Sequence, residues 1–184
     1  MLEIGVLLST GDNMIHKNNR VSLKLVESDR VSLANIVSQC PFNNPVKAED
    51  FRVTLLYSKT SIENFVPENK MHNTVITGAS IWYDDYYGIN SLVITLDAPT
   101  LHNRRQEIIK QYNAMPLSEN YVPHITLVYN LPPWKRPKYR WWVNQVIDNF
   151  EMNYKNKIIR LYGEEIQSTD DKIFTPLSSR EGLE

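Results

Sequence analysis

The sequence predicts an α+β fold with two pseudo-symmetric lobes of antiparallel sheet, flanking helices and a groove between the lobes. The first observation is the order of the apolar patterns, in which strands and helices do not alternate as they do in a doubly wound sheet. The second is a repeat: the stretch FRVTLLYS at 51–58 recurs as PHITLVYN at 123–130. In that frame Arg52 falls on His124 and Thr54 on Thr126. A repeated strand favours a duplicated arrangement with one copy in each lobe.

Composition favours one bilobal domain that spans residues 1–184. With 42% hydrophobic and 22% charged residues, the chain is typical of a soluble globular protein. A formal net charge of −1 gives no basic surface for long nucleic acid. Cys40 is the sole cysteine, which rules out an internal disulfide, and no apolar run reaches transmembrane length. We therefore expect a cytoplasmic monomer or weak dimer that does not bind membranes.

The first 41 residues predict a strand at 4–9, a polar loop at 11–20 and a helix. Ser28 or Asp29 is the expected N-cap of this helix, and Pro41 ends it. Its buried face follows the i, i+3, i+4, i+7 spacing of Leu33, Ile36, Val37 and Cys40.

The remaining elements follow from β-branched runs and helical spacing. Strands are expected at 51–57, 73–82, 91–96 and 158–166, besides the strand that carries His124. One helix opens at Pro99 and Thr100, and another follows the proline-rich stretch 131–138. Their buried faces are expected to carry Leu101, Ile108, Ile109 and Tyr112 in the first, and Trp142, Val146, Ile147 and Phe150 in the second.

Strand alternation brings four polar side chains of the repeat together. Residues two apart share a face, so Arg52 and Thr54 face one way, with Leu56, and His124 and Thr126 do the same, with Val128. The same alternation predicts Tyr57 and Tyr129 on the opposite face. If the lobes face each other, the four polar groups converge on one groove. Two hydroxyls and a cation suit a phosphate, and an imidazole suits proton transfer near neutral pH.

The stretch PHITLVY resembles the H-x-T motif of the two-histidine (2H) phosphoesterase superfamily, in which each of two lobes supplies one such motif. The two copies here lie 72 positions apart (124 − 52), in keeping with that superfamily. The context GINSLVITLDAPTLHNRRQEIIKQYNA before the motif is similar, more narrowly, to phage anti-CBASS enzymes that degrade the cyclic oligonucleotide signals of the host. The resemblance covers roughly residues 50–130.

The resemblance implies a phosphodiesterase that cleaves 3′-5′ bonds of cyclic di- or trinucleotides without a metal or cofactor, in the host bacterial cytoplasm if a phage encodes it. One histidine would take the proton of a ribose 2′-hydroxyl, and the other would protonate the departing 5′-oxygen. The threonines would hold the phosphate oxygens. Trp82 would stack on a base, although a core tryptophan is the alternative. Glu165 would accept a hydrogen bond from a base edge, with Glu164 as the alternative.

The first motif departs from that pattern, because Arg52 stands where the superfamily has histidine. Guanidinium stays protonated, so Arg52 cannot shuttle a proton, although it could clamp a phosphate. The sequence leaves open an engineered substitution, an enzyme with one catalytic histidine, and a binding protein that sequesters its ligand. The tripeptide HNT at 72–74 also matches H-x-T, but it lacks the repeated frame, and we expect His72 to be a solvated strand entrance.

Other readings stay open at this point. His124 could be a buried core histidine instead of a proton shuttle, and the stretch PPWKRPKYRWW at 132–142 could close over an anionic ligand or cap the groove. Arg104 and Arg105 are expected on a solvated helix face. No glycine-rich phosphate loop and no zinc-ligand spacing is present in the sequence. Besides the enzyme, the alternatives are a cyclic-nucleotide sponge of the same fold and a phosphodiesterase of RNA ends or 2′-5′ bonds.

Overall fold

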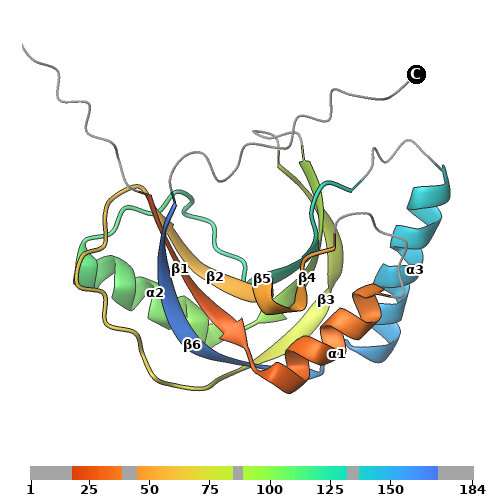
Figure 1. Cartoon of the computed structure of the whole chain (residues 1–184), viewed down its shortest axis with the longest axis horizontal. Helices are drawn as coiled ribbons and strands as arrows, with labels where there is room; N and C mark the ends of the chain where they lie inside the picture. The colour runs from red at the N-terminus through yellow and green to blue at the C-terminus, as the bar shows by residue number, and fades with distance from the viewer. Residues whose placement is uncertain (1–17, 39–44, 85–88, 132–136, 170–184) are drawn as a thin grey trace, which may run out of the picture.

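The computed structural model describes residues 18–38, 45–84, 89–131 and 137–169 (Figure 1). These residues form six strands: β1 (Asn18–Leu25), β2 (Arg52–Ser58), β3 (His72–Asp84), β4 (Ile89–Asp97), β5 (His124–Val128) and β6 (Ile158–Thr169). They also form three α-helices, α1 (Glu27–Ser38), α2 (Pro99–Tyr112) and α3 (Pro137–Asn153), and a short 3₁₀ helix, η1 (Ala48–Asp50). The expected strand at 4–9 lies outside the described residues.

All strand pairs are antiparallel, and their order is β1-β2-β5-β4-β3-β6, closed by pairing of β6 with β1. The α+β class is therefore confirmed. The sheet consists of two halves, β6-β1-β2 and β5-β4-β3. The halves pair at four positions between β3 and β6, and they meet a second time at β2 and β5. Within the described residues this junction has one paired position, Val53 with Ile125. Helix α2 lies outside the first half and α3 packs on β3 of the second (Figure 1).

Strand β1 is not among the predicted elements: its first residues fall in the stretch 11–20, which is predicted to be a polar loop, and no element is predicted at 21–25. The strand does alternate: Val21, Leu23 and Leu25 are buried in the core, whereas Lys24 is exposed. Its other face is polar because Arg20, Ser22 and Lys24 point toward polar groups of β6: Gln167 for Arg20 and Glu165 for the other two. Because one face of β1 lies on the polar side of the sheet, the composition of the strand resembles that of a loop.

Helix α1 begins at Glu27, so the expected N-cap at Ser28 or Asp29 is wrong. Both residues lie in the first turn, and both side chains bind Arg160 on β6 instead. The Asp29 carboxylate accepts a hydrogen bond from the Arg160 backbone N–H at 2.8 Å and one from its Nη2 at 3.0 Å. The acidic residue thus ties the helix start to the sheet. Cys40 and Pro41 lie outside the described residues.

Two β-bulges at equivalent positions shape the repeated strands. Val21 pairs with Leu56 and Ser22 with Thr54, so Leu55 is an extra residue in β2. The sequence-equivalent Leu127 is extra in β5, because β4 pairs with Val128 and then with Thr126. An extra residue reverses the faces of everything that follows it. The duplication predicted from the repeat is thus matched by the same irregularity in both copies.

The bulges overturn the predicted faces at the ends of both strands. Leu56 and Val128 are buried at 2% and 1% exposure, and neither shares the face of the threonines. Tyr57 and Tyr129 return to that face. The Tyr129 hydroxyl lies within hydrogen-bonding reach of Thr126 and close enough to Tyr57, Arg20 and Arg52 to interact electrostatically with them. Two tyrosines therefore join the polar side of the sheet.

The core is formed by one cluster of apolar residues on the other side of the strands, capped by the helices. Its largest fully buried side chains include Phe51, Phe150, Leu23, Ile94 and Ile125. Among the described residues, no helix is long and apolar enough to cross a membrane.

Candidate active site

His124 opens strand β5 directly after Pro123, at the edge of a cavity. Its Nδ1 lies 2.8 Å from the carbonyl oxygen of Val122. Burial lowers the pKa of His124, and this hydrogen bond opposes the shift only in part. The ring is therefore neutral at pH 7 with its proton on Nδ1, since a carbonyl can only accept. Nε2 then carries a free lone pair, which is the state of a general base.

Thr54 and Thr126 lie beside the junction of the two halves. Thr54 follows Val53 and Thr126 follows Ile125, and Val53 and Ile125 are the two residues that pair across the junction. Both threonines are partly exposed. Thr54 and His124 line the same cavity, which has a volume of about 350 Å³. The structure thus brings together the second-motif imidazole and the first-motif hydroxyl, whereas Arg52 and Thr126 are not among the residues that line this cavity.

Trp82 forms one wall of this cavity from strand β3. Its ring centroid lies 4.3 Å from that of His124, with the planes inclined at 49°. The side chain is partly exposed, so Trp82 is not a plain core residue. Its contact with the imidazole places an aromatic face next to the expected position of the phosphate.

Arg52 is held by protein acceptors at all three guanidinium nitrogens. Nη1 donates to Glu165 Oε1 at 2.9 Å, while Nη2 and Nε donate to the Asp50 carboxylate and carbonyl, each at 3.0 Å. Glu165 is shared with Lys24, whose Nζ lies 2.8 Å from the second carboxylate oxygen. A bidentate phosphate clamp by Arg52 would therefore have to break existing ion pairs.

A third bulge determines which of Glu164 and Glu165 faces the polar side of the sheet. Strand β6 carries an extra residue at Gly163, where β1 pairs on either side of it and φ is +76°. Glycine adopts this backbone conformation without strain. Beyond it Glu164 points into the protein at 7% exposure, and Glu165 faces Arg52. Of the two glutamates, only Glu165 faces the polar side of the sheet.

The prediction that Arg104 and Arg105 lie on a solvated face of α2 is wrong, because the two side chains are 8% and 5% exposed. Arg104 makes a two-nitrogen ion pair with Glu164 at 2.8 and 2.9 Å. Arg105 lines the same cavity as His124. The signal was present in the sequence: with Leu101 and Ile108 the two arginines complete an i, i+3, i+4, i+7 stripe.

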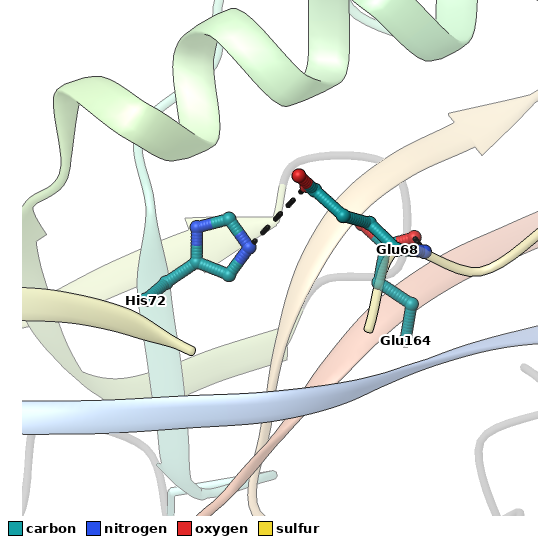
Figure 2. A group of neighbouring side chains, drawn as sticks. All are labelled: Glu68, His72 and Glu164. Carbon is teal, nitrogen blue, oxygen red and sulfur yellow. Dashed lines mark hydrogen bonds and ion pairs between the residues drawn. The ribbon is translucent and has the colours of Figure 1, made fainter. Parts of the chain in front are cut away.

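His72 is also not solvated: it is 2% exposed and lies between β6 and helix α2. Figure 2 shows its ring directed toward the carboxylate of Glu68, with Nε2 3.7 Å from Oε2. Burial is the main cause that lowers its pKa. His72 is therefore separated from the cavity of His124 and does not lie on the repeated frame.

Together with Glu164, these two residues form a group of three metal-ligand types within 4.8 Å, which the sequence spacing did not reveal (Figure 2). Arg104 already fills the place of a cation there, because its guanidinium binds Glu164 and lies 3.6 Å from Glu68. The backbone N–H of Glu68 donates to Glu164 as well, at 2.7 Å. A metal ion would have to displace this arginine, so the group fits a buried ion-pair network better than a metal centre.

Two antiparallel halves, each with a bulged strand that carries a polar motif, define a 2H phosphoesterase-like fold. Usb1 of Kluyveromyces marxianus has this fold: its structure matches with a TM-score of 0.51 at 10% identity, covering 83% of this chain and 94% of Usb1. The family model for "Anti-CBASS protein Acb1" matches residues 18–158, and the chain belongs to that family.

The chain is similar to curated members from phages. It is 29% identical to anti-CBASS protein Acb1 of Escherichia phage RB16 over 99 residues, which are 54% of this chain and 56% of that protein. It is also 29% identical to that of Yersinia phage phiR1-RT over 105 residues, or 57% and 67% of the two chains. The matched part thus spans little more than half the length of the RB16 protein.

Proposed function

We propose that this chain is a metal-independent phosphodiesterase that opens 3′-5′ linkages of cyclic di- or trinucleotides and thereby counters CBASS immunity in a bacterial host. The observation that carries the proposal is the state of His124. A neutral imidazole with Nδ1 held by a carbonyl presents a free Nε2 beside Thr54 and an aromatic wall at Trp82. The site thus combines a proton acceptor, a hydrogen-bond donor to the phosphate and a stacking surface for a base.

In the proposed reaction, Nε2 of His124 accepts the proton of a ribose 2′-hydroxyl, and the 2′-oxygen forms a bond to phosphorus. The bond from phosphorus to the 5′-oxygen breaks, which leaves a 2′,3′-cyclic phosphate and a 5′-hydroxyl. Thr54 and Thr126 donate hydrogen bonds to the phosphate oxygens as negative charge develops. Water or the newly protonated imidazole supplies the proton to the 5′-oxygen, because Arg52 stays charged and holds its protons.

A sponge of the same fold is the second candidate, and the pairing of Arg52 favours it. The position that would carry the other proton shuttle is locked by Glu165 and Asp50. Losing one general acid or base typically costs about 10²- to 10⁴-fold in rate. A protein with that loss would bind its ligand and release it largely intact.

One experiment separates the candidates. The full chain is incubated in EDTA with a panel of cyclic di- and trinucleotides and with RNA bearing 2′,3′-cyclic or 2′-5′-linked ends, and the products are resolved by chromatography. The enzyme yields linear products from the cyclic substrates. Binding without products identifies the sponge, and conversion of the RNA ends alone would contradict both.

A further inference from the structure

The segment that joins helix α2 to strand β5, residues 113–123, supplies the group that sets the state of His124. The carbonyl of Val122 in this segment accepts a hydrogen bond from His124 Nδ1 at 2.8 Å, two residues before the strand begins. The segment forms no helix or strand of its own, apart from one isolated bridge at Pro116. A carbonyl can hold an imidazole only if its own position is fixed, so the contacts of this segment bear on the state of His124.

Backbone hydrogen bonds fix the two ends of the segment and leave its middle to side chains. Near the start, the Leu117 N–H donates to the Tyr57 carbonyl at 2.8 Å. At the end, the Pro123 carbonyl accepts a hydrogen bond from the Leu96 N–H at 2.9 Å. Among the described residues, no backbone hydrogen bond joins residues 118–122 to another part of the chain. Side chains must therefore hold these five positions, which include Val122.

Two side chains of helix α2 contact this middle part. Arg105 is 5% exposed, and its Nη2 donates to the Ser118 carbonyl at 2.6 Å. The guanidinium carbon of Arg105 also lies 5.1 Å from the ring centroid of Tyr121. His102, three residues earlier on the helix, contacts the same ring edge-on, with the centroids 5.0 Å apart and the planes at 68°. Because Tyr121 directly precedes Val122, a ring held in this way also restricts the backbone at the Val122 carbonyl.

The charge of Arg105 is not needed for packing alone. Among the described residues it has no ion pair with a carboxylate, and burial lowers the pKa of its guanidinium. The neighbouring Arg104, by contrast, is paired with Glu164. A buried cation without a carboxylate is costly, and an apolar side chain of similar volume would fill the same position without that cost. What the guanidinium adds is the donor to Ser118 and the cationic face against Tyr121.

We propose that Arg105 is a positioning residue, which holds residues 118–122 so that the Val122 carbonyl keeps the proton of His124 on Nδ1. A neutral imidazole released from that carbonyl also populates the tautomer with its proton on Nε2, and this nitrogen then cannot accept another proton. Arg105 thereby maintains the general base without touching the reacting atoms. The inference rests on the proposed function in taking Nε2 as the proton acceptor, whereas the tautomer itself is observed without any ligand.

The test is the two-bond ¹H–¹⁵N spectrum of the full chain labelled with ¹⁵N-histidine at about pH 8, where ordinary imidazoles are neutral. The signals of His124 are those that disappear in His124→Ala, and in the parent chain they should show the proton on Nδ1. Arg105→Met should shift them toward the Nε2-protonated pattern and lower kcat for a cyclic dinucleotide by about 10-fold or more. Lys110→Met, which removes an exposed cation from the same helix, should change neither the spectrum nor the rate.

Tyr121 gives a second, matched pair of variants that leaves Arg105 in place. Its hydroxyl is buried and has no hydrogen-bond partner among the described residues, so Tyr121→Phe keeps the contacts of the ring and should keep the parent tautomer. Tyr121→Leu removes the ring between His102 and Arg105 and should shift the tautomer as Arg105→Met does.

A parent chain with the proton of His124 on Nε2 would overturn the proposal. So would a parent-like spectrum in Arg105→Met, or in Tyr121→Leu if circular dichroism shows that Arg105→Met does not fold. Failure of the proposed enzymatic function is seen separately: the parent chain would then cleave no cyclic dinucleotide, while the tautomer of His124 would still depend on Arg105.

Discussion

The guanidinium of Arg52 on β2 and the carboxylate of Glu165 on β6 form an ion pair of 2.9 Å across strand β1. Lys24 of the intervening strand binds the other oxygen of the same carboxylate. Arg52 is therefore integrated into the polar side of its own half of the sheet. A residue that cannot transfer protons stands where the resemblance predicts the first histidine, and Glu165 and Asp50 hold its guanidinium.

The first prediction concerns this position. Arg52→His should raise single-turnover cleavage of a cyclic dinucleotide by about 10²-fold or more, because it restores a second group that can transfer a proton. Arg52→Lys is the matched control, since it keeps the charge and should give no gain. His124→Ala should abolish the cleavage that the parent chain shows. An unchanged rate in Arg52→His would mean that position 52 is not the missing half of the site.

The two threonines give the second prediction. Thr54→Ala and Thr126→Ala should each weaken ligand binding or transition-state stabilisation by roughly 1–3 kcal/mol, the usual effect of removing a hydrogen-bond donor to a charged partner. Binding and turnover are measured for both variants, with Thr77→Ala on the exposed part of β3 as a control. A variant of either motif threonine that matched the parent, with its circular dichroism unchanged, would contradict the shared groove.

The third prediction is a pH profile. Burial lowers the pKa of His124, and the base form is the active one, so the rate should be on its plateau at pH 7. It should fall only as the pH drops through a pKa below the ordinary value of about 6.5. Values of kcat/KM between pH 4.5 and 8 test this expectation. A rate that rises as the pH falls below 6.5 would assign His124 the role of an acid.

Chelation is the fourth test. Cleavage should be unchanged after exhaustive dialysis against EDTA, since Arg104 already supplies the positive charge at Glu68, His72 and Glu164. The rate before and after dialysis is the measurement. Activity that disappears in EDTA and returns with Mg²⁺ or Mn²⁺ would show that a metal takes part.

The fifth prediction concerns stability. Arg104→Met should lower the free energy of unfolding by about 3–5 kcal/mol, because it leaves the carboxylate of Glu164 buried without its counter-ion. Urea denaturation measures the change. The double variant Arg104→Met with Glu164→Gln should recover much of the loss, since neither partner is then charged. A single variant as stable as the parent would show that water reaches Glu164.

Local patterns in the sequence predicted much of the fold. Strands β2 to β6 and helices α2 and α3 lie within a few residues of their predicted bounds, because their apolar spacing reflects burial on one side. His124 and Thr126 on β5, and Thr54 on β2, also lie where simple alternation placed them. Alternation failed beyond Leu55 and Leu127, since these two bulges depend on the pairing of a neighbouring strand and carry an ordinary strand residue at the extra position.

The buried charges were the other failure. Arginine is expected in solvent, yet Arg104 is retained in the interior by Glu164, a residue 60 positions away that only tertiary contact brings close. The group formed by Glu68, His72 and Glu164 was not predicted for the same reason, because Glu164 is far from the other two residues in the sequence. Sequence spacing detects ligands on one element, and these three come from a loop and two strands.

The narrow junction between β2 and β5 has an evolutionary consequence. Each motif strand is paired along its length with an outer strand of its own half, β1 for β2 and β4 for β5, and with the other motif strand at one position only. A change in one motif strand is therefore accommodated mainly by partners within its own half, and the halves stay joined through the pairing of β3 with β6. Arginine at position 52 is accommodated in this way, because Glu165 and Asp50, which bind its guanidinium, belong to the same half, whereas His124 lies in the other half.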